Sequence, residues 1–217
     1  MIISRARQYI FVHIPKTGGT SLAQALEERA TRDDVLIGDT PKAQRRKSRL
    51  KHIKTHGRLW KHSSLADIDG YVSPDDIASM FVFTMVRNPW DRLVSFYHWL
   101  RAQTFQHPMV LLAKDLTFGA FLRHDEVQKS FRQSPAASYV RNIRGETQCT
   151  LFIRLEKFKD DAQPLFDHLG FRFDLPHLNA SSRVGDFRQY YTPELRDIVA
   201  QACSDDIARF GYAFDGS

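Results

Sequence analysis

A strand-like apolar run that ends in a glycine turn and continues at once as a helix is the feature that most limits how this chain can fold. It lies between Tyr9 and Leu26 and reads YIFVHIPKTGGTSLAQAL. In such an arrangement backbone N–H groups gather at the start of a helix, where the helix dipole favours an anion. The stretch therefore predicts a phosphate-binding turn that follows a buried strand.

Strand and helix patterns alternate along the rest of the chain. Buried strands are predicted at Tyr9–His13, Phe81–Val86 and Cys149–Leu155, with a weaker one near His52–Thr55. Helices are predicted at Thr20–Ala30, Pro89–Ala102, Phe118–His124, Pro135–Arg141, Lys159–Leu169 and Pro193–Phe210. We expect one α/β domain over residues 1–217, with a mainly parallel central sheet flanked by helices and ligands at the carboxyl ends of its strands.

The first turn contains the residue types that hold a phosphate group. Glycine can take positive φ and lets the backbone approach a ligand closely, lysine adds a charge, and hydroxyl groups add donors. The candidate contacts are Lys16, Thr17, Gly18, Gly19, Thr20 and Ser21.

This turn differs from the Walker A loop of nucleoside triphosphatases. There the lysine follows the second glycine, whereas Lys16 precedes both glycines and the first glycine of the motif is absent. No obvious magnesium ligand accompanies it. A kinase-like use of ATP therefore stays an alternative, as does an ordinary strand-to-helix turn without a ligand.

A second strand-to-helix turn occurs in FVFTMVRNPWDRLVSFYHWL. Asn88 and Pro89 suit the start of the helix, whose expected buried stripe is Trp90, Leu93, Tyr97 and Leu100. Arg87 at the strand end and Ser95 on a more polar face, eight positions later, suit a second phosphate. The alternative is that Arg87 pairs with a carboxylate such as Asp91.

The net charge of +6 is concentrated between Thr40 and Ala66, a segment without any acidic residue. Such a run is either a solvated face or a binding surface for an anionic cofactor, an anionic substrate or nucleic acid. Trp60 is its only aromatic residue, which disfavours a stacking platform for single strands. A basic module without enzymatic activity, formed by residues 42–62, remains an alternative.

With both turns in view, the chain resembles the sulfotransferase family. PKTGGTS is similar to the family's 5′-phosphosulfate loop and RNPWDRLVSFY to its 3′-phosphate motif, while FIRLEKF, HLNASSR and the C-terminal segment continue the likeness. It is most similar to the carbohydrate-type branch that includes heparan sulfate 2-O-sulfotransferase and bacterial relatives. The resemblance implies a P-loop-NTPase-like sulfotransferase fold and transfer of a sulfuryl group from 3′-phosphoadenosine 5′-phosphosulfate to a hydroxyl acceptor, such as a carbohydrate.

The resemblance also implies roles for single residues. KTHGRL, Lys54 to Leu59, resembles the Lys-x-His segment of cytosolic sulfotransferases, so His56 is the expected general base and Lys54 an expected sulfate contact. Lys16 would stabilise the leaving phosphate and the transferring group. His13 is expected to fix the turn by hydrogen bonding.

The remaining expectations concern an alternative base, further nucleotide contacts, metal ions and the location of the protein. Glu156 is the runner-up base, and Ser182 and Arg183 are expected to close over the nucleotide. No cluster of Cys and His has the spacing of metal ligands, so we expect a reaction without metal. The two cysteines and the lack of a signal sequence or an apolar run of membrane-spanning length predict a cytoplasmic protein without a membrane span. With the resemblance, we expect a small-molecule or carbohydrate hydroxyl acceptor as the partner, and no nucleic acid.

Overall fold

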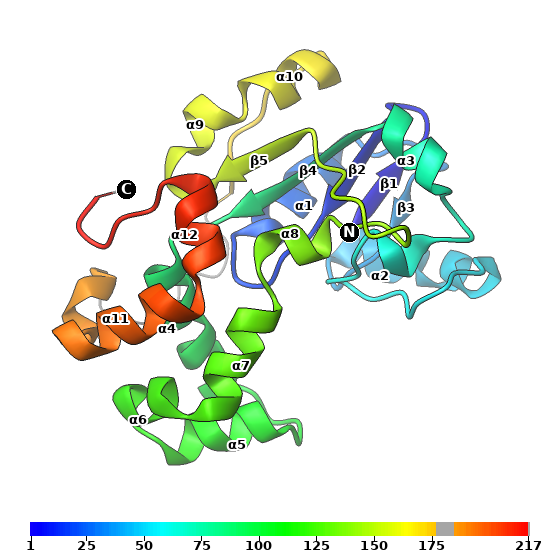
Figure 1. Cartoon of the computed structure of the whole chain (residues 1–217). Coiled ribbons are helices and arrows are strands. Elements are labelled where there is room, and N and C mark those ends of the chain that lie inside the picture. Colours follow the sequence, from blue (N-terminus) through cyan, green and yellow to red (C-terminus); the bar gives the residue numbers. More distant parts are fainter. Residues whose placement is uncertain (177–184, 217) are drawn as a thin grey trace. The chain divides into compact units, whose positions relative to one another are not determined.

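The structure, a computed structural model, describes residues 1–176 and 185–216 (Figure 1). The chain divides into two compact units. The first contains Met1–Val86 and the stretch that begins at Ala136, and the second contains Arg87–Pro135 and the C-terminal stretch.

The first unit is built on a five-stranded sheet with the order β3-β1-β2-β4-β5. The strands β2, β4 and β5 are parallel to one another, whereas β1 is antiparallel to both of its neighbours, β2 and β3. Four of the five strands therefore point the same way, and the expected mainly parallel sheet is confirmed. Their bounds are Ile2–Ser4 (β1), Tyr9–Val12 (β2), Val35–Leu36 (β3), Phe81–Val86 (β4) and Leu151–Arg154 (β5).

Side chains of alternate residues cover the two faces of this sheet. Tyr9 and Phe11 pack in one hydrophobic core with helix residues such as Leu26, while Ile10 and Val12 pack in a second core. This is the alternation that a strand imposes when both faces of its sheet are buried. The helices are α1 (Gly19–Glu28), α2 (Pro41–Arg46), α3 (Pro74–Ser79), α8 (Ala136–Tyr139), α9 (Phe158–Asp161) and α10 (Gln163–Leu169), with short 3₁₀ turns η1 (Lys47–His52), η2 (Ala66–Ile68) and η3 (Leu155–Lys157).

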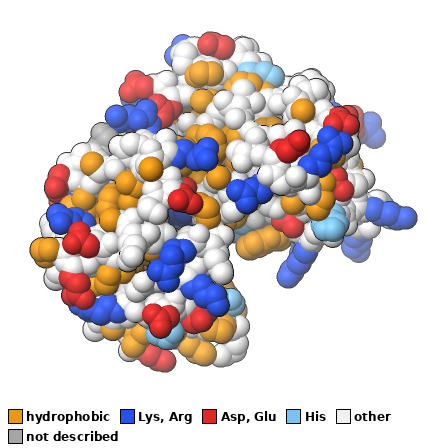
Figure 2. All heavy atoms as spheres, in the orientation of Figure 1, with side chains coloured by type: hydrophobic (Ala, Val, Ile, Leu, Met, Phe, Trp, Pro, Cys, Tyr) orange, Lys and Arg blue, Asp and Glu red, His pale blue; other side chains and the backbone are white. Residues whose placement is uncertain are grey.

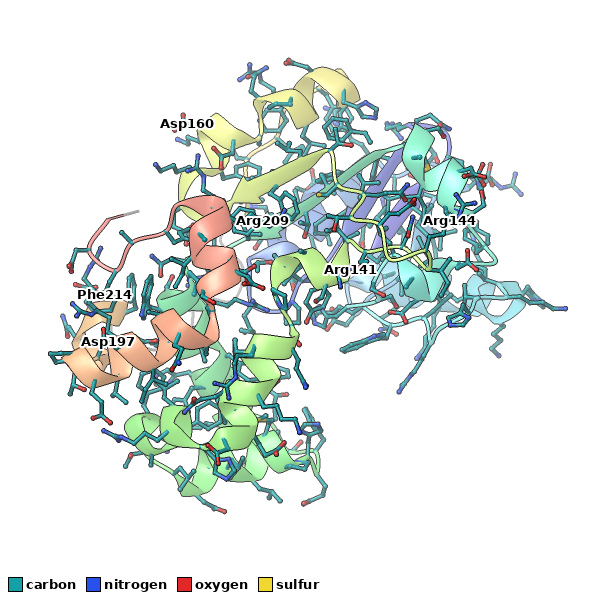
Figure 3. All side chains as sticks on the ribbon, in the orientation of Figure 1. Arg141, Arg144, Asp160, Asp197, Arg209 and Phe214 are labelled. Atoms are coloured by element: carbon teal, nitrogen blue, oxygen red, sulfur yellow. The ribbon has the colours of Figure 1, made fainter. Side chains whose placement is uncertain are left out.

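The second unit is helical in its described residues. Its core forms around α4, where Trp90, Leu93, Tyr97 and Leu100 are buried as expected. Phe214, labelled in Figure 3, packs edge-on against Trp90 with 5.6 Å between the ring centres. The elements are α4 (Pro89–Arg101), α5 (Pro108–Asp115), α6 (Phe118–Arg123), α7 (Asp125–Gln133), η4 (Phe187–Tyr190), α11 (Pro193–Ala202) and α12 (Ser204–Phe210). No helix in the described parts of either unit is long and apolar enough to cross a membrane.

Three expected elements are wrong in detail. The weak strand near His52–Thr55 does not form, since Lys47–His52 is a 3₁₀ turn and residues 53–55 have no regular structure. The helix expected at Lys159–Leu169 is two helices, because Pro164 has no N–H to donate and fits only the first turn of a new helix. The helix expected at Pro193–Phe210 breaks at Cys203.

Candidate active site

The parallel strands β2, β4 and β5 end at the same edge of the sheet. Val12 pairs with Thr84, whose hydroxyl group donates to the carbonyl of Val12 at 2.7 Å, and Val86 pairs with Arg154. The turn after β2 and the segment after β5 therefore start from the same edge of the sheet, where parallel sheets bind their ligands.

Two residues of the turn have a left-handed backbone. Lys16 has φ of 66° and Gly18 has φ of 84°. A side chain on Gly18 would also lack room, since a Cβ atom would lie 2.9 Å from Cδ1 of Leu155 and 3.3 Å from Cε of Met85. Positive φ is uncommon for lysine and clusters at functional sites in proteins, so the turn holds Lys16 in a special conformation.

The helix α1 begins at this turn without a side-chain cap. Gly18 is the N-cap, and no side chain of the described residues accepts a hydrogen bond from the first turn. The N–H groups of Ser21 and Leu22 donate to the carbonyl of Gly18. The N–H groups of Gly19 and Thr20 come too early in the helix to donate to one of its own carbonyls. The first turn also contains no acidic residue. This start of α1 can accept an anion through backbone N–H groups.

The hydroxyl groups of the turn differ in what they already bind. Thr17 is buried and donates its hydroxyl hydrogen to the carbonyl of Ile14 at 2.9 Å. A contact from Thr17 to a phosphate would therefore come from its backbone. Thr20 is partly exposed and Ser21 is buried.

His13 supports the turn by packing. A Cβ atom on Gly19 would lie 2.2 Å from Cδ2 of His13, so the imidazole ring lies directly against the first residue of α1. The ring also stacks on Phe11. Burial, together with nearby positive charges, holds the pKa of His13 well below its usual value. His13 is therefore a neutral, buried part of the turn.

His62 is a residue that the sequence reasoning did not single out. Its Nδ1 lies 2.7 Å from the carbonyl oxygen of His13, and the two rings meet edge-on at 4.7 Å. Because a carbonyl oxygen only accepts, Nδ1 carries the hydrogen and Nε2 of the neutral ring is an acceptor. Burial lowers the pKa of His62 to about 4. A histidine without a motif gives no sequence signal, so only the fold could bring it to the turn.

His56 and Lys54 lie in the same unit on an exposed segment. The N–H of His56 donates to the carbonyl of Asp69 at 2.7 Å, and the N–H of Gly57 donates to the carbonyl of Asp67 at 3.0 Å. A Cβ atom on Gly57 would lie 2.2 Å from Oδ1 of Asp67, so the segment is packed closely onto this loop. The backbone of His56 is fixed, and its side chain faces solvent.

The second phosphate segment belongs to the second unit. Arg87 donates from Nε and Nη2 to Oδ2 of Asp91 at 2.8 and 2.5 Å, which is the carboxylate pairing that stood as the alternative. Asn88 caps α4 by accepting from the N–H groups of Trp90 and Asp91. Ser95 is buried with 8% of its surface exposed, rather than on an open polar face.

The remaining expected site residues are Glu156, Ser182 and Arg183. Glu156 is exposed in η3, directly after β5. Ser182 and Arg183 lie outside the described residues. Within residues 1–176 and 185–216, no group of three or more Cys, His, Asp or Glu side chains is placed to hold a metal ion.

Comparisons with known proteins give a family match and a similar solved structure. The sequence model of the Sulfotransferase family matches residues 1–213. No curated protein matches the chain significantly. A crystal structure of mouse sulfotransferase SULT7A1 complexed with PAP is similar at 18% sequence identity and a TM-score of 0.46, over 94% of this chain and 85% of that chain.

Proposed function

The chain belongs to the sulfotransferase family, and from this premise we propose that it transfers a sulfuryl group from 3′-phosphoadenosine 5′-phosphosulfate to a hydroxyl acceptor. The observation that carries the proposal is the turn before α1. Its helix start lacks a side-chain cap among the described residues, and a lysine precedes the glycines in a left-handed conformation. An uncapped helix start with an adjacent cation suits the 5′-phosphosulfate.

Each phosphate of the nucleotide is assigned to its own segment. Lys16, the backbone at Thr17, Gly18 and Gly19, and the side chains of Thr20 and Ser21 would hold the 5′ group. Arg87 and Ser95 would hold the 3′-phosphate. The guanidinium fork matches phosphate oxygens, and a ligand phosphate would compete with Asp91 for it. Ser182 and Arg183 remain proposed contacts on the strength of the resemblance alone.

The chemistry asks for two contributions from the protein. The acceptor oxygen forms a bond to sulfur while the bond between sulfur and the bridging phosphate oxygen breaks, and the acceptor proton must be taken up. Lys16 would stabilise the negative charge that develops on the departing phosphate. A histidine would take the proton. No metal ion is needed for these steps in our proposal.

Two histidines compete for the role of base. His56 follows from the resemblance to the Lys-x-His segment, in which Lys54 would contact the sulfate. His62 is favoured by geometry, because the carbonyl of His13 orients its ring and leaves Nε2 as the acceptor beside the turn. A pKa of about 4 keeps His62 neutral, and an anion bound close to the ring would raise this pKa towards the range of an efficient base.

A test of the base compares His56→Ala, His62→Asn and His62→Ala in sulfuryl transfer. Loss of the base should lower kcat by roughly 10²–10⁴-fold with little change in nucleotide affinity. If His62→Asn, which keeps a donor for the carbonyl of His13, is as inactive as His62→Ala while His56→Ala is active, His62 is the base. The opposite pattern assigns His56.

The acceptor, the extent of the domain and the compartment are part of the same proposal. A carbohydrate hydroxyl is the proposed acceptor, supported by the resemblance to the carbohydrate-type branch. A single sulfotransferase domain over residues 1–217 is supported by the family match, which includes residues of both units. A cytoplasmic location is supported by Cys149 and Cys203, which form no disulfide bond in the described residues.

The test of the nucleotide is calorimetry with adenosine 3′,5′-bisphosphate in the absence of magnesium. The wild type should bind at micromolar concentration, and Lys16→Ala and Arg87→Ala should each bind at least about tenfold more weakly, as expected for a lost charged hydrogen bond. Arg101→Ala, an exposed arginine later on α4, is the matched control and should bind normally. Binding of ATP with magnesium instead, or of nucleic acid only, would overturn the proposal.

A further inference from the structure

The first unit contains a cavity that the proposed reaction does not use. It has a volume of about 380 Å³ and is lined by residues of the stretch 32–36, by residues of α2 and η1, and by Ile53 and Tyr71. Cavities that bind small molecules start at roughly 300 Å³, so this one has room for a small organic ligand.

The cavity lies at the opposite edge of the sheet from the phosphate turn. The strand β3 is antiparallel to β1, which is antiparallel to β2, so β3 runs in the direction of β2. Asp33 and Asp34 precede β3 and are therefore at the amino end of this strand, while the turn with Lys16 follows the carboxyl end of β2. The cavity is thus a separate place on the same unit.

Two arginines are fixed at the wall of this cavity. Arg46 donates from Nη1 to the carbonyl oxygens of Thr31 at 2.7 Å and Asp34 at 3.4 Å, and Arg49 donates from Nη1 to the carbonyl of Arg32 at 2.6 Å. Within the described residues, the Nε and Nη2 groups of Arg46 and Arg49 make no hydrogen bond. Both side chains are anchored at one nitrogen and keep donors for a ligand.

The carboxylates of the cavity do not neutralise these arginines. Asp34 is buried and accepts from the N–H of Thr31 at 2.8 Å and from its hydroxyl at 2.7 Å, so its oxygens are satisfied inside the loop. Asp33 is exposed. Arg32, Arg46 and Arg49 form no ion pair with any carboxylate in the described parts of the chain. The cavity is therefore lined by three arginines and two aspartates, and the carboxylate of Asp34 already has its partners within the loop.

The remaining wall is apolar. Leu50, Ile53 and Tyr71 line the cavity and are each partly exposed. Arg5 holds Tyr71 in place, because its guanidinium lies 5.5 Å from the ring centre and donates to the carbonyl of Tyr71 at 2.9 Å. A ligand in this space would meet donors on one side and an aromatic and aliphatic surface on the other.

We propose that this cavity binds a small organic anion, a sulfate or phosphate monoester on an apolar ring. The ester group lies on Arg46 and Arg49, and the ring lies against Leu50, Ile53 and Tyr71. The proposal gives a role to part of the basic segment between Thr40 and Ala66, since Arg46 lies on α2 and Arg49 on η1. Other lysine and arginine side chains project into solvent from this part of the surface, at the right of the view in Figure 2. The site does not depend on the proposed function.

The experiment is calorimetry with 4-nitrophenyl sulfate and, separately, 4-nitrophenyl phosphate, on the full chain saturated with adenosine 3′,5′-bisphosphate. At least one ester should bind, and Arg46→Gln and Arg49→Gln should each weaken binding about tenfold, as a lost charged hydrogen bond does. Arg45→Gln, an exposed neighbour on α2 outside the cavity, should leave binding unchanged. Arg49 is exposed, so its variant will fold even where Arg46→Gln loosens the loop.

Three results would overturn the proposal. These are no binding of either ester, equal weakening by the Arg45 variant, and ester binding that is seen without the bisphosphate but is lost on the saturated chain. The apolar wall has its own test, because inorganic sulfate should bind at least about tenfold more weakly than 4-nitrophenyl sulfate. Equal affinity for the two would show that the ring contributes nothing. If the protein does not bind the bisphosphate, the same ester titrations are carried out without it. A failure of the nucleotide proposal is therefore distinguishable from a failure of the proposal for this cavity.

Discussion

The two segments proposed to hold phosphate differ in how many of their polar groups already form hydrogen bonds within the protein. At the start of α1 the cap is Gly18, which offers no side chain, and the first turn keeps N–H groups for a ligand. At the start of α4 the side chain of Asn88 accepts from two N–H groups, and Arg87 is paired with Asp91.

This difference indicates two ways of binding. The first segment would bind through backbone donors whose positions are fixed by glycine, so its shape decides affinity. The second would bind through a side chain that exchanges a carboxylate partner for a phosphate, so its charge decides affinity. Substitutions that alter shape should damage the first segment most, and those that alter charge should damage the second.

The largest effect is expected from Gly19→Ala. The added methyl group would lie 2.2 Å from Cδ2 of His13, so either the buried ring or the turn must move. Overpacking of this kind costs about 1–3 kcal/mol of stability. Bisphosphate affinity should fall at least about tenfold, since N–H donors must be placed within hydrogen-bond distance of the phosphate.

Chemical denaturation measures the loss of stability of Gly19→Ala, and calorimetry measures its loss of affinity. Gly38→Ala, where nothing lies within 4 Å, is the control and should change neither. Normal affinity in Gly19→Ala would contradict a binding mode based on shape.

A smaller effect is expected from Asn88→Ala. The cap of α4 is lost, and Nδ2 no longer donates to the carbonyl of Ala213 at 3.1 Å, so stability should fall by about 1–2 kcal/mol. Bisphosphate affinity should change little, because Arg87 keeps its charge. Thermal unfolding gives the first quantity, with Thr192→Ala, which removes the cap of α11, as a control of similar size. A collapse in affinity at unchanged stability would make Asn88 a ligand contact instead.

The smallest effect concerns acid sensitivity near the first segment. The folded state lowers the pKa of His62 from 6.5 to about 4, so the unfolded chain takes up this proton first as the pH falls. The stability that depends on neutral His62 is therefore complete above pH 6.5 and is lost as the pH falls towards 4. Denaturation at pH 7 and pH 5 should show a smaller loss for His62→Asn than for the wild type. His52→Asn, at an exposed position, should behave like the wild type, and equal losses in all three proteins would refute the prediction.

Much of the first unit could be predicted because its strands and turns have strong local signals. Phe81–Val86 was predicted to the residue, since β-rich apolar runs bounded by polar residues have few other structures. The turn before α1 was predicted from its glycines, and Gly18 does take positive φ. The short strands β1 and β3 were missed because three and two residues are too short to show a period.

Candidate site residues could be proposed from the sequence where a motif points to the chemistry, and not where tertiary contacts decide. Lys16 and Arg87 are proposed from motifs in the sequence. The proximity of His62 to the turn depends on a contact between residues 49 positions apart, which no local pattern contains. The pairing of Arg87 with Asp91 was weighed as an alternative because the two are one helical turn apart, and the structure contains it.

The central claim is that two segments each hold one phosphate of the same nucleotide, and one calorimetric comparison tests it most directly. Adenosine 3′,5′-bisphosphate and adenosine 5′-monophosphate are titrated into the wild type, Lys16→Ala and Arg87→Ala. Lys16→Ala should weaken binding of both nucleotides, while Arg87→Ala should weaken the bisphosphate at least about tenfold and leave the monophosphate unchanged. Equal weakening of both nucleotides by Arg87→Ala, or no weakening at all, would contradict the assignment of Arg87 to the 3′-phosphate.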